Sequence, residues 1–214
     1  MNKPGRRVRS SSGFASAPRA SAAPNRGVVA VLLAAATGLC AHAATLYWDG
    51  SSGSWNRAAS WSSDPAATTP DPSSAPGAND LAVFSVAGAA GLQSVSLDAN
   101  QAAKRLQVLG GASGGVTLYG GGTARTLSLG TGGMEVFEGA GPLVIGSTVE
   151  GQGVAVTLTG NQAWTNRSAY TAVVQNGIGA SGAYALTLGG TNGFRLNGPG
   201  TFSGGLTLSS STVG

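Results

Sequence analysis

Short runs in which apolar residues alternate with small or polar ones recur along most of this chain. The clearest are four runs that share a Thr-Leu dyad, with leucines at Leu118, Leu158, Leu188 and Leu208, at intervals of 40, 30 and 20 residues. Alternation with a period of two indicates a β-strand with one buried face. Repetition of such short units is typical of a solenoid, in which each turn gains a core only by stacking on its neighbours.

Similar runs of three to five residues follow one another from about residue 92 onward. We expect strands at residues 94–97, 106–109, 116–119, 126–129, 134–137, 143–145, 154–158, 171–174, 184–188, 194–196 and 206–208. A spacing of roughly eight to twelve residues fits either a β-sandwich or a β-solenoid. Glycine pairs at nearly every predicted corner favour the solenoid, because tight stacked corners need residues that accept positive φ and leave room for the next turn.

Residues 44–86 have a different pattern, with three of the four tryptophans and a proline-rich stretch at 64–80 that can be neither helix nor central strand. A strand resumes at 81–84. The indoles of Trp48, Trp55 and Trp61 could stack on sugar rings, which makes them the candidate glycan-binding residues. Alternatively, they close the N-terminal end of the solenoid, whose first turn would otherwise expose apolar side chains and an unpaired strand edge. The pattern favours the cap.

The first 43 residues are typical of a targeting segment. They hold six basic residues and no acid, followed by an apolar run of fourteen residues at 27–40 and the small residues of Ala41-His42-Ala43. This arrangement predicts a signal peptide for the Sec pathway, cleaved before Ala44; the alternative is an uncleaved N-terminal anchor. We therefore expect an extracellular or bacterial cell-surface protein, with no transmembrane segment in the mature chain.

Removal of this leader changes the charge and the available chemistry. The full chain has a net charge of +4, but six of its twelve basic residues and none of its eight acids lie in the leader, so the mature chain is slightly acidic. Nucleic acid is therefore not an expected partner. Cys40 and His42 are the only cysteine and histidine. Without them, Ser-His and Cys-His nucleophile pairs and histidine-based metal sites are excluded.

Catalysis on sugars would have to use the remaining acids and arginines. The candidates are Glu135, Glu138 and Glu150, with Arg125 or Arg167. The spacing of Glu135 and Glu138 places them on opposite faces of an extended strand, so they do not form the converging carboxylate pair of a glycoside hydrolase. We interpret these groups as solvated edge charges, and expect a protein that is not an enzyme and has no cofactor or metal.

Two segments near the C-terminus are similar to a known repeat. Residues 186–192, Leu-Thr-Leu-Gly-Gly-Thr-Asn, and residues 200–208, Gly-Thr-Phe-Ser-Gly-Gly-Leu-Thr-Leu, resemble the autotransporter-associated β-strand repeat, in which L-T-L-x-G-x-N leads into T-Y-S-G-G-T-T. Phe202 stands at the aromatic position, and residues 194–199 are inserted between the two halves. The opening at residues 47–50, with Trp55 and Trp61, also resembles the start of the mature region in large secreted proteins of this group.

The resemblance implies a right-handed parallel β-helix, the passenger domain of an exported protein. Members usually end in an outer-membrane barrel or a sorting tail, whereas this chain ends mid-pattern, so we expect a truncated piece. The combined prediction is an all-β, right-handed parallel β-helix with a Trp-rich cap at 44–86 and solenoid repeats at 87–214. We expect a non-catalytic, adhesin-like scaffold whose partner is an extracellular polysaccharide or a host or neighbouring cell surface. The alternatives are a polysaccharide lyase or hydrolase on the same fold, and a carbohydrate-binding β-sandwich.

Overall fold

The computed structural model describes residues 43–50, 52–67, 71–85 and 91–210. The chain divides into two compact units, Met1–Leu39 and Cys40–Gly214, and all described residues belong to the second. The expected signal peptide at 1–43 lies outside the described residues apart from Ala43, which precedes the first strand. None of the described helical segments has the length and apolarity needed to cross a membrane.

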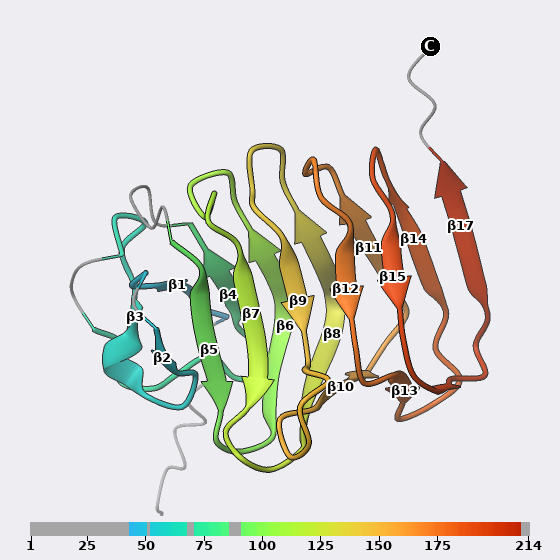
Figure 1. The fold of residues 1–214 in the computed structure, drawn as a ribbon, viewed down its shortest axis with the longest axis horizontal. Coiled ribbons are helices and arrows are strands. Elements are labelled where there is room, and N and C mark those ends of the chain that lie inside the picture. The colour runs from blue at the N-terminus through green and yellow to red at the C-terminus, as the bar shows by residue number, and fades with distance from the viewer. Residues whose placement is uncertain (1–42, 51, 68–70, 86–90, 211–214) are drawn as a thin grey trace, which may run out of the picture. The chain divides into compact units, whose positions relative to one another are not determined.

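The described residues of the second unit form a right-handed parallel β-solenoid (Figure 1). Its turns stack in register, so that Val95, Leu118, Ile145, Val174 and Leu196 lie one above the other. In this column, successive residues are separated by between 22 and 29 positions in the sequence. The solenoid prediction is therefore confirmed. The β-sandwich alternative is wrong, because successive turns pair in parallel through a continuous coil.

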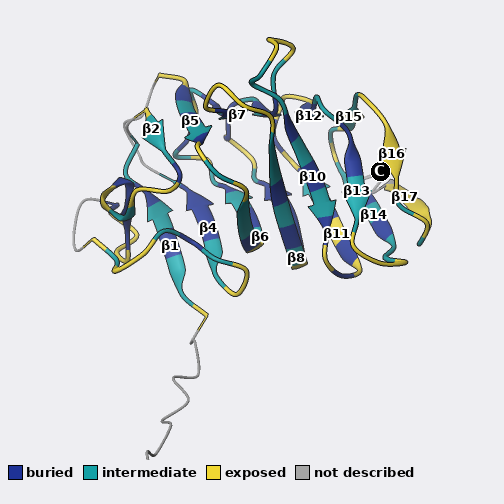
Figure 2. Cartoon of the chain, turned by 90° about the horizontal axis from the view of Figure 1, so that it is seen from below, coloured by how far each residue is buried: buried dark blue, intermediate teal, exposed yellow. Residues whose placement is uncertain are grey.

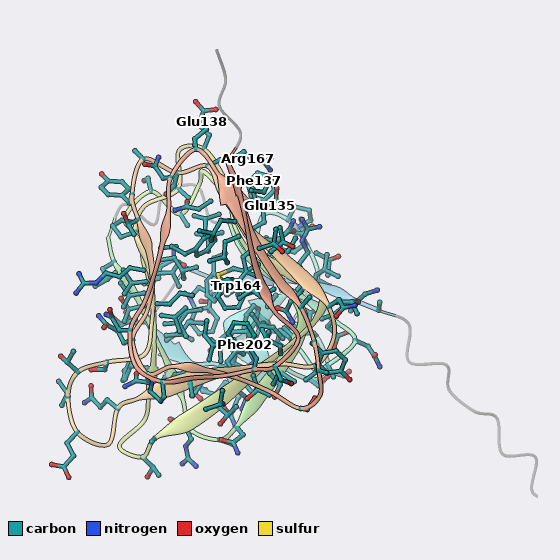
Figure 3. All side chains as sticks on the ribbon, turned by 90° about the vertical axis from the view of Figure 1, so that its right-hand side faces the viewer. Glu135, Phe137, Glu138, Trp164, Arg167 and Phe202 are labelled. Carbon is teal, nitrogen blue, oxygen red and sulfur yellow. The ribbon has the colours of Figure 1, made fainter. Side chains whose placement is uncertain are left out.

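The solenoid has three faces, seen in cross-section in Figure 3. One face is a six-stranded sheet that contains β2 (Gly53–Ser54), β5 (Gln93–Leu97), β7 (Val116–Gly120), β9 (Leu143–Ile145), β12 (Ala172–Val174) and β15 (Phe194–Leu196). An eleven-stranded sheet forms the other two. On the second face lie β10 (Val154–Leu158), β13 (Ile178–Ala180), β16 (Gly200–Thr201) and the first halves of β6 (Gln101–Val108) and β8 (Arg125–Val136). The third has the second halves of β6 and β8 with β1 (Thr45–Trp48), β4 (Leu81–Phe84), β11 (Gln162–Asn166), β14 (Leu186–Gly190) and β17 (Leu206–Ser210).

Strand β8 bends around the corner between the second and third faces. Residues 125–129 pair with β10, and residues 134–136 pair with β11. Gly133 lies at the bend with φ of +64°, and a Cβ there would lie 2.1 Å from the carbonyl oxygen of Ala163 on the next turn. The two strands expected at 126–129 and 134–137 are therefore one bent strand.

The four Thr-Leu dyads do not form one column. Leu118 lies on the first face and Leu158 on the second, whereas Leu188 and Leu208 lie on the third. Only Leu188 and Leu208 are paired, one turn apart. The interval of ten residues is therefore not the repeat length, although each dyad does mark a strand.

The core runs along the inside of the coil, and buried residues alternate with more exposed ones along most strands (Figure 2). At its N-terminal end the regular coil is replaced by a small antiparallel arrangement. There β3 (Trp61–Ser62), which follows the 3₁₀ turn η1 (Ala58–Ser60), pairs antiparallel with β1. Trp164 and Phe202 point into the coil near the other end (Figure 3).

Candidate functional site

The three candidate tryptophans form a packed cluster at the N-terminal end. The ring of Trp61 lies edge-on to Trp48 and Trp55, at centroid distances of 5.1 and 4.9 Å, and all three contact Phe84. The indole Nε1 of Trp61 donates a hydrogen bond to the Trp55 carbonyl oxygen at 2.9 Å. Each of the three tryptophans is 0% exposed. No indole face is open to a sugar in this arrangement, which supports the cap interpretation.

The ionisable side chains that the structure brings together lie on the outside of the third face. Glu135 on β8 forms ion pairs with Arg105 on β6 and with Arg167, which directly follows β11 (Figure 3). Each carboxylate oxygen accepts from one guanidinium, because Oε2 is paired with Arg105 and Oε1 with Arg167. The amide of Gln107 is 3.4 Å from the same Oε2. The three charged residues come from three successive turns, so they connect the turns along the solenoid axis.

The burial of this charge cluster is uneven. The Glu135 side chain is 11% exposed, whereas those of Arg105 and Arg167 are 36% and 46% exposed. The Arg167 guanidinium also lies 5.1 Å from the centre of the Phe137 ring, a cation–π contact. The expectation of a solvated edge charge is therefore wrong for Glu135. Its side chain is covered because two long arginine side chains reach it from the neighbouring turns, while Gln107 and Thr165 are the residues paired with it.

The other expected charges do not join the cluster. Glu138 is exposed at the corner after β8 and points away from the coil (Figure 3). Glu150 is exposed in the connection from β9 to β10, and Arg125 begins β8 on the second face. The structure thus unites Glu135 and Arg167 but not the remaining candidates. Both carboxylate oxygens of Glu135 are occupied by guanidinium groups, so neither is free to exchange a proton with a substrate.

Two open depressions flank Arg167. One is lined by residues that include Glu138, Ser168, Thr191 and Asn192, and the other by Thr165, Thr187 and the backbone at 189–191. These groups offer guanidinium, hydroxyl, amide and backbone hydrogen-bonding atoms, which suit a hydroxyl-rich chain lying along the face. Within the described ranges, no three His, Cys, Asp or Glu side chains come close enough to hold a metal ion.

Asparagines that brace the corners are an element that the strand pattern missed. The Asn176 Oδ1 accepts from the backbone N–H groups of Ser147 and Val154, and its Nδ2 donates to the Ser147 carbonyl oxygen, all at 3.0 Å. Asn166 similarly donates to the carbonyl oxygens of Tyr170 and Gly193. The sequence signal is an asparagine at or near the end of a strand, because Asn166 ends β11 and Asn176 lies two residues after β12. It identifies a corner but not the turn to which the side chain bonds.

No protein-family model, curated protein or solved structure matches this chain. The likeness to the autotransporter-associated repeat therefore rests on the residues at 186–208 and on the Trp-rich opening alone.

Proposed function

We propose that this chain is a non-catalytic scaffold of an exported, adhesin-like protein, whose long faces contact an extracellular polysaccharide or another cell surface. The main observation in support is that outward positions stack into continuous columns along the coil. On the first face such a column contains Ser94, Thr117, Val144, Val173 and Arg195. A second column contains Ala102, Ser128, Thr157, Gly179 and Thr201. Outward side chains at a regular spacing along the coil suit an extended ligand better than a compact substrate.

The charge cluster supports the absence of catalysis in this proposal. Glu135 is neutralised by two arginines, and the exposed Glu138 does not face it (Figure 3). An acid and a base or nucleophile facing one bond, as a hydrolase requires, do not occur at this cluster. The second candidate, a lyase or hydrolase, therefore gains no specific support there.

Binding to surfaces is tested with the purified full chain immobilised on beads. We expect saturable retention of particular extracellular polysaccharides or whole cells, with no release of shortened sugar chains on prolonged incubation. Thr117→Glu and Thr157→Glu alter one outward column each, and Val149→Glu, on an exposed corner, is the matched control. Retention unaffected by either column variant, or turnover of a retained polysaccharide, would refute the proposed scaffold.

Export is tested separately by expression of the full chain in a bacterium with a Sec pathway. We expect the protein outside the cytoplasm, with an N-terminus at Ala44 by peptide sequencing. Replacing Ala41 and Ala43 with bulky residues should retain the leader, because signal peptidase requires small residues at these positions. A full-length product confined to the cytoplasm would contradict export. If the chain is a passenger domain, its reading frame continues past Gly214 into a barrel or sorting tail.

A further inference from the structure

One of the two depressions beside Arg167 lies on the outside of the third face, above Gly189. Gly189 on β14 pairs with Thr165 on β11 and with Ser209 on β17. Because glycine has no side chain, this outward column is lowest at its middle residue. Thr187 and Thr191 lie two residues before and two residues after Gly189. We call this depression the Gly189 basin, and its lining includes Thr165, Arg167, Thr187, Thr191 and Ser209.

The hydroxyl groups around the Gly189 basin are available to a ligand. Within the described part of the chain, the side chains of Thr165, Thr187, Thr191 and Ser209 form no hydrogen bond with protein atoms. Thr165 and Ser209 are two strand spacings apart, roughly 10 Å. This distance leaves room above Gly189 for one sugar ring, and the basin is open, so a longer sugar chain can continue along the face.

Arg167 forms one side of the Gly189 basin, and its guanidinium is held in place by two neighbours. Its Nη2 group is paired with the Glu135 carboxylate, and the guanidinium carbon lies 5.1 Å from the centre of the Phe137 ring (Figure 3). Among the described residues, its Nε and Nη1 groups donate to no protein acceptor, and the side chain is 46% exposed. A fixed guanidinium with free N–H groups loses little conformational entropy when it binds a ligand.

The local charge favours an anionic group at this position. Arg105 and Arg167 share the single carboxylate of Glu135, so the charge cluster keeps one positive charge. None of the described residues that line the Gly189 basin is Asp or Glu. The second depression beside Arg167 is different, because the exposed Glu138 lines it and would repel an anion. An anionic group is therefore favoured on the Gly189 side of Arg167.

We propose that the Gly189 basin binds a uronic acid residue of an extracellular polysaccharide, with the sugar carboxylate on Arg167 and the sugar hydroxyl groups on the surrounding threonines and Ser209. This inference rests on the proposed contact with polysaccharides and names their chemical class. The planar guanidinium presents parallel N–H groups that match the two oxygens of a carboxylate. The hydroxyl groups of Ser and Thr both donate and accept hydrogen bonds, as sugar hydroxyl groups do. An acidic peptide would satisfy Arg167 but would leave most of these hydroxyl groups without a partner.

Isothermal titration calorimetry of the purified full chain tests the ligand class with trigalacturonate, a trisaccharide of uronic acids. We expect saturable binding that salt weakens, and affinities about tenfold or more lower for the neutral trigalactose of the same linkage and for triglutamate. Absence of trigalacturonate binding, or equal affinity for either of the other two probes, would overturn the proposal. Retention of neutral polysaccharides on beads would then still support the scaffold, so the two failures are distinguishable.

A pair of arginine variants tests the role of the charge. Arg167→Gln should weaken trigalacturonate binding about tenfold or more, because a hydrogen bond between charged groups is lost. Arg105→Gln is the matched control, since it removes the same charge and the other ion pair of Glu135 but does not line the Gly189 basin. It should leave the affinity nearly unchanged. Equal losses in the two variants would refute a specific contact with Arg167.

A pair of glycine variants tests the position of the ligand. Gly189→Val should fill the basin and abolish most of the binding. Gly179→Val is the matched control, because Gly179 is an outward glycine on the second face, where a Cβ would lie 3.2 Å from its nearest neighbour, against 3.1 Å at Gly189. Near-ultraviolet circular dichroism of the tryptophans checks that all four variants are folded. Unchanged binding in a folded Gly189→Val would overturn the proposed site.

Discussion

Leu188 and Leu208 occupy the same inward position on neighbouring turns, yet Leu188 is 8% exposed and Leu208 is 76% exposed. The difference arises because β14 is covered by β17, whereas β17 is not covered by another described strand. We expect Leu188→Ala to lower the free energy of unfolding by about 2–4 kcal/mol and Leu208→Ala by less than about 1 kcal/mol. Urea denaturation measures both free energies of unfolding. Equal losses would show that β17 is covered in solution.

Removal of the charge of Glu135 should destabilise the stacked turns of the solenoid. Glu135→Gln leaves Arg105 and Arg167 close together without their shared carboxylate, and we expect a loss of about 1–2 kcal/mol, reduced by the partial exposure of both arginines. Glu138→Gln, an exposed corner carboxylate, should change the stability by less than about 0.5 kcal/mol. High salt screens these charges, so it should reduce the difference in the free energy of unfolding between the parent and Glu135→Gln. Equal stability of Glu135→Gln and Glu138→Gln at low salt would contradict a stabilising role for the charge cluster.

Contact between corners of neighbouring turns should make Gly141 intolerant of a side chain. A Cβ at Gly141 would lie 2.4 Å from the Ser113 carbonyl oxygen and the Gly115 nitrogen, so Gly141→Ala should cost about 2 kcal/mol or more. Gly193→Ala is the control, because no atom lies within 4 Å of its Cβ position and its φ is not in the positive region. Its unfolding temperature should be unchanged or slightly higher. Equal effects would argue against close stacking at this corner.

The buried tryptophan cluster should respond to unfolding but not to sugars. We expect Trp61→Ala to cost about 3–5 kcal/mol, because a fully buried indole is lost together with its hydrogen bond to Trp55. Tryptophan fluorescence should remain constant when oligosaccharides are added to the folded chain. A saturable shift that disappears in Trp55→Ala would contradict the cap and restore the glycan-stacking hypothesis.

The stability of the corner at Asn176 should depend on the N–H groups of the side-chain amide as well as on the shape of the side chain. Asn176→Asp keeps the acceptor for Ser147 and Val154 but loses the donor and places a carboxylate against the Ser147 carbonyl oxygen. We expect a loss of about 1–3 kcal/mol at neutral pH, measured by thermal unfolding. Asn197→Asp, at a corner one turn further along the coil, is a comparison variant whose amide donates to a side chain, that of Gln175, rather than to the backbone. An unchanged Asn176→Asp would show that the corner does not need this donor.

Alternation in the sequence was sufficient to predict the class of fold and most strands, because most inward positions of this solenoid are apolar. It failed for β11 and β13. Gln162–Asn166 has one large apolar residue, Trp164, and Ile178–Ala180 has only Ile178, so neither run shows two apolar positions in alternation. Both are strands because the turns below and above supply their hydrogen bonds. These hydrogen bonds form only when the turns stack, so the sequence of the strand itself does not indicate them.

The charge cluster could not be predicted for a related reason. Arg105, Glu135 and Arg167 are separated by 30 and 32 residues, and turns of unequal length bring them together. Arg105 lies in a segment, residues 101–105, that could also make one helical turn by composition. Only the pairing of β6 with β8 and of β8 with β11 brings the three side chains within contact distance.

From β4 onward, paired residues on neighbouring turns are separated by between 20 and 30 residues, and the strands remain paired. Extra residues are taken up at the corners, so each turn advances the coil by one strand spacing, about 4.8 Å, whatever its length. The axial position of each strand is therefore set by the number of turns before it and not by the number of residues. A longer corner changes the surface of the protein without moving the next turn along the axis.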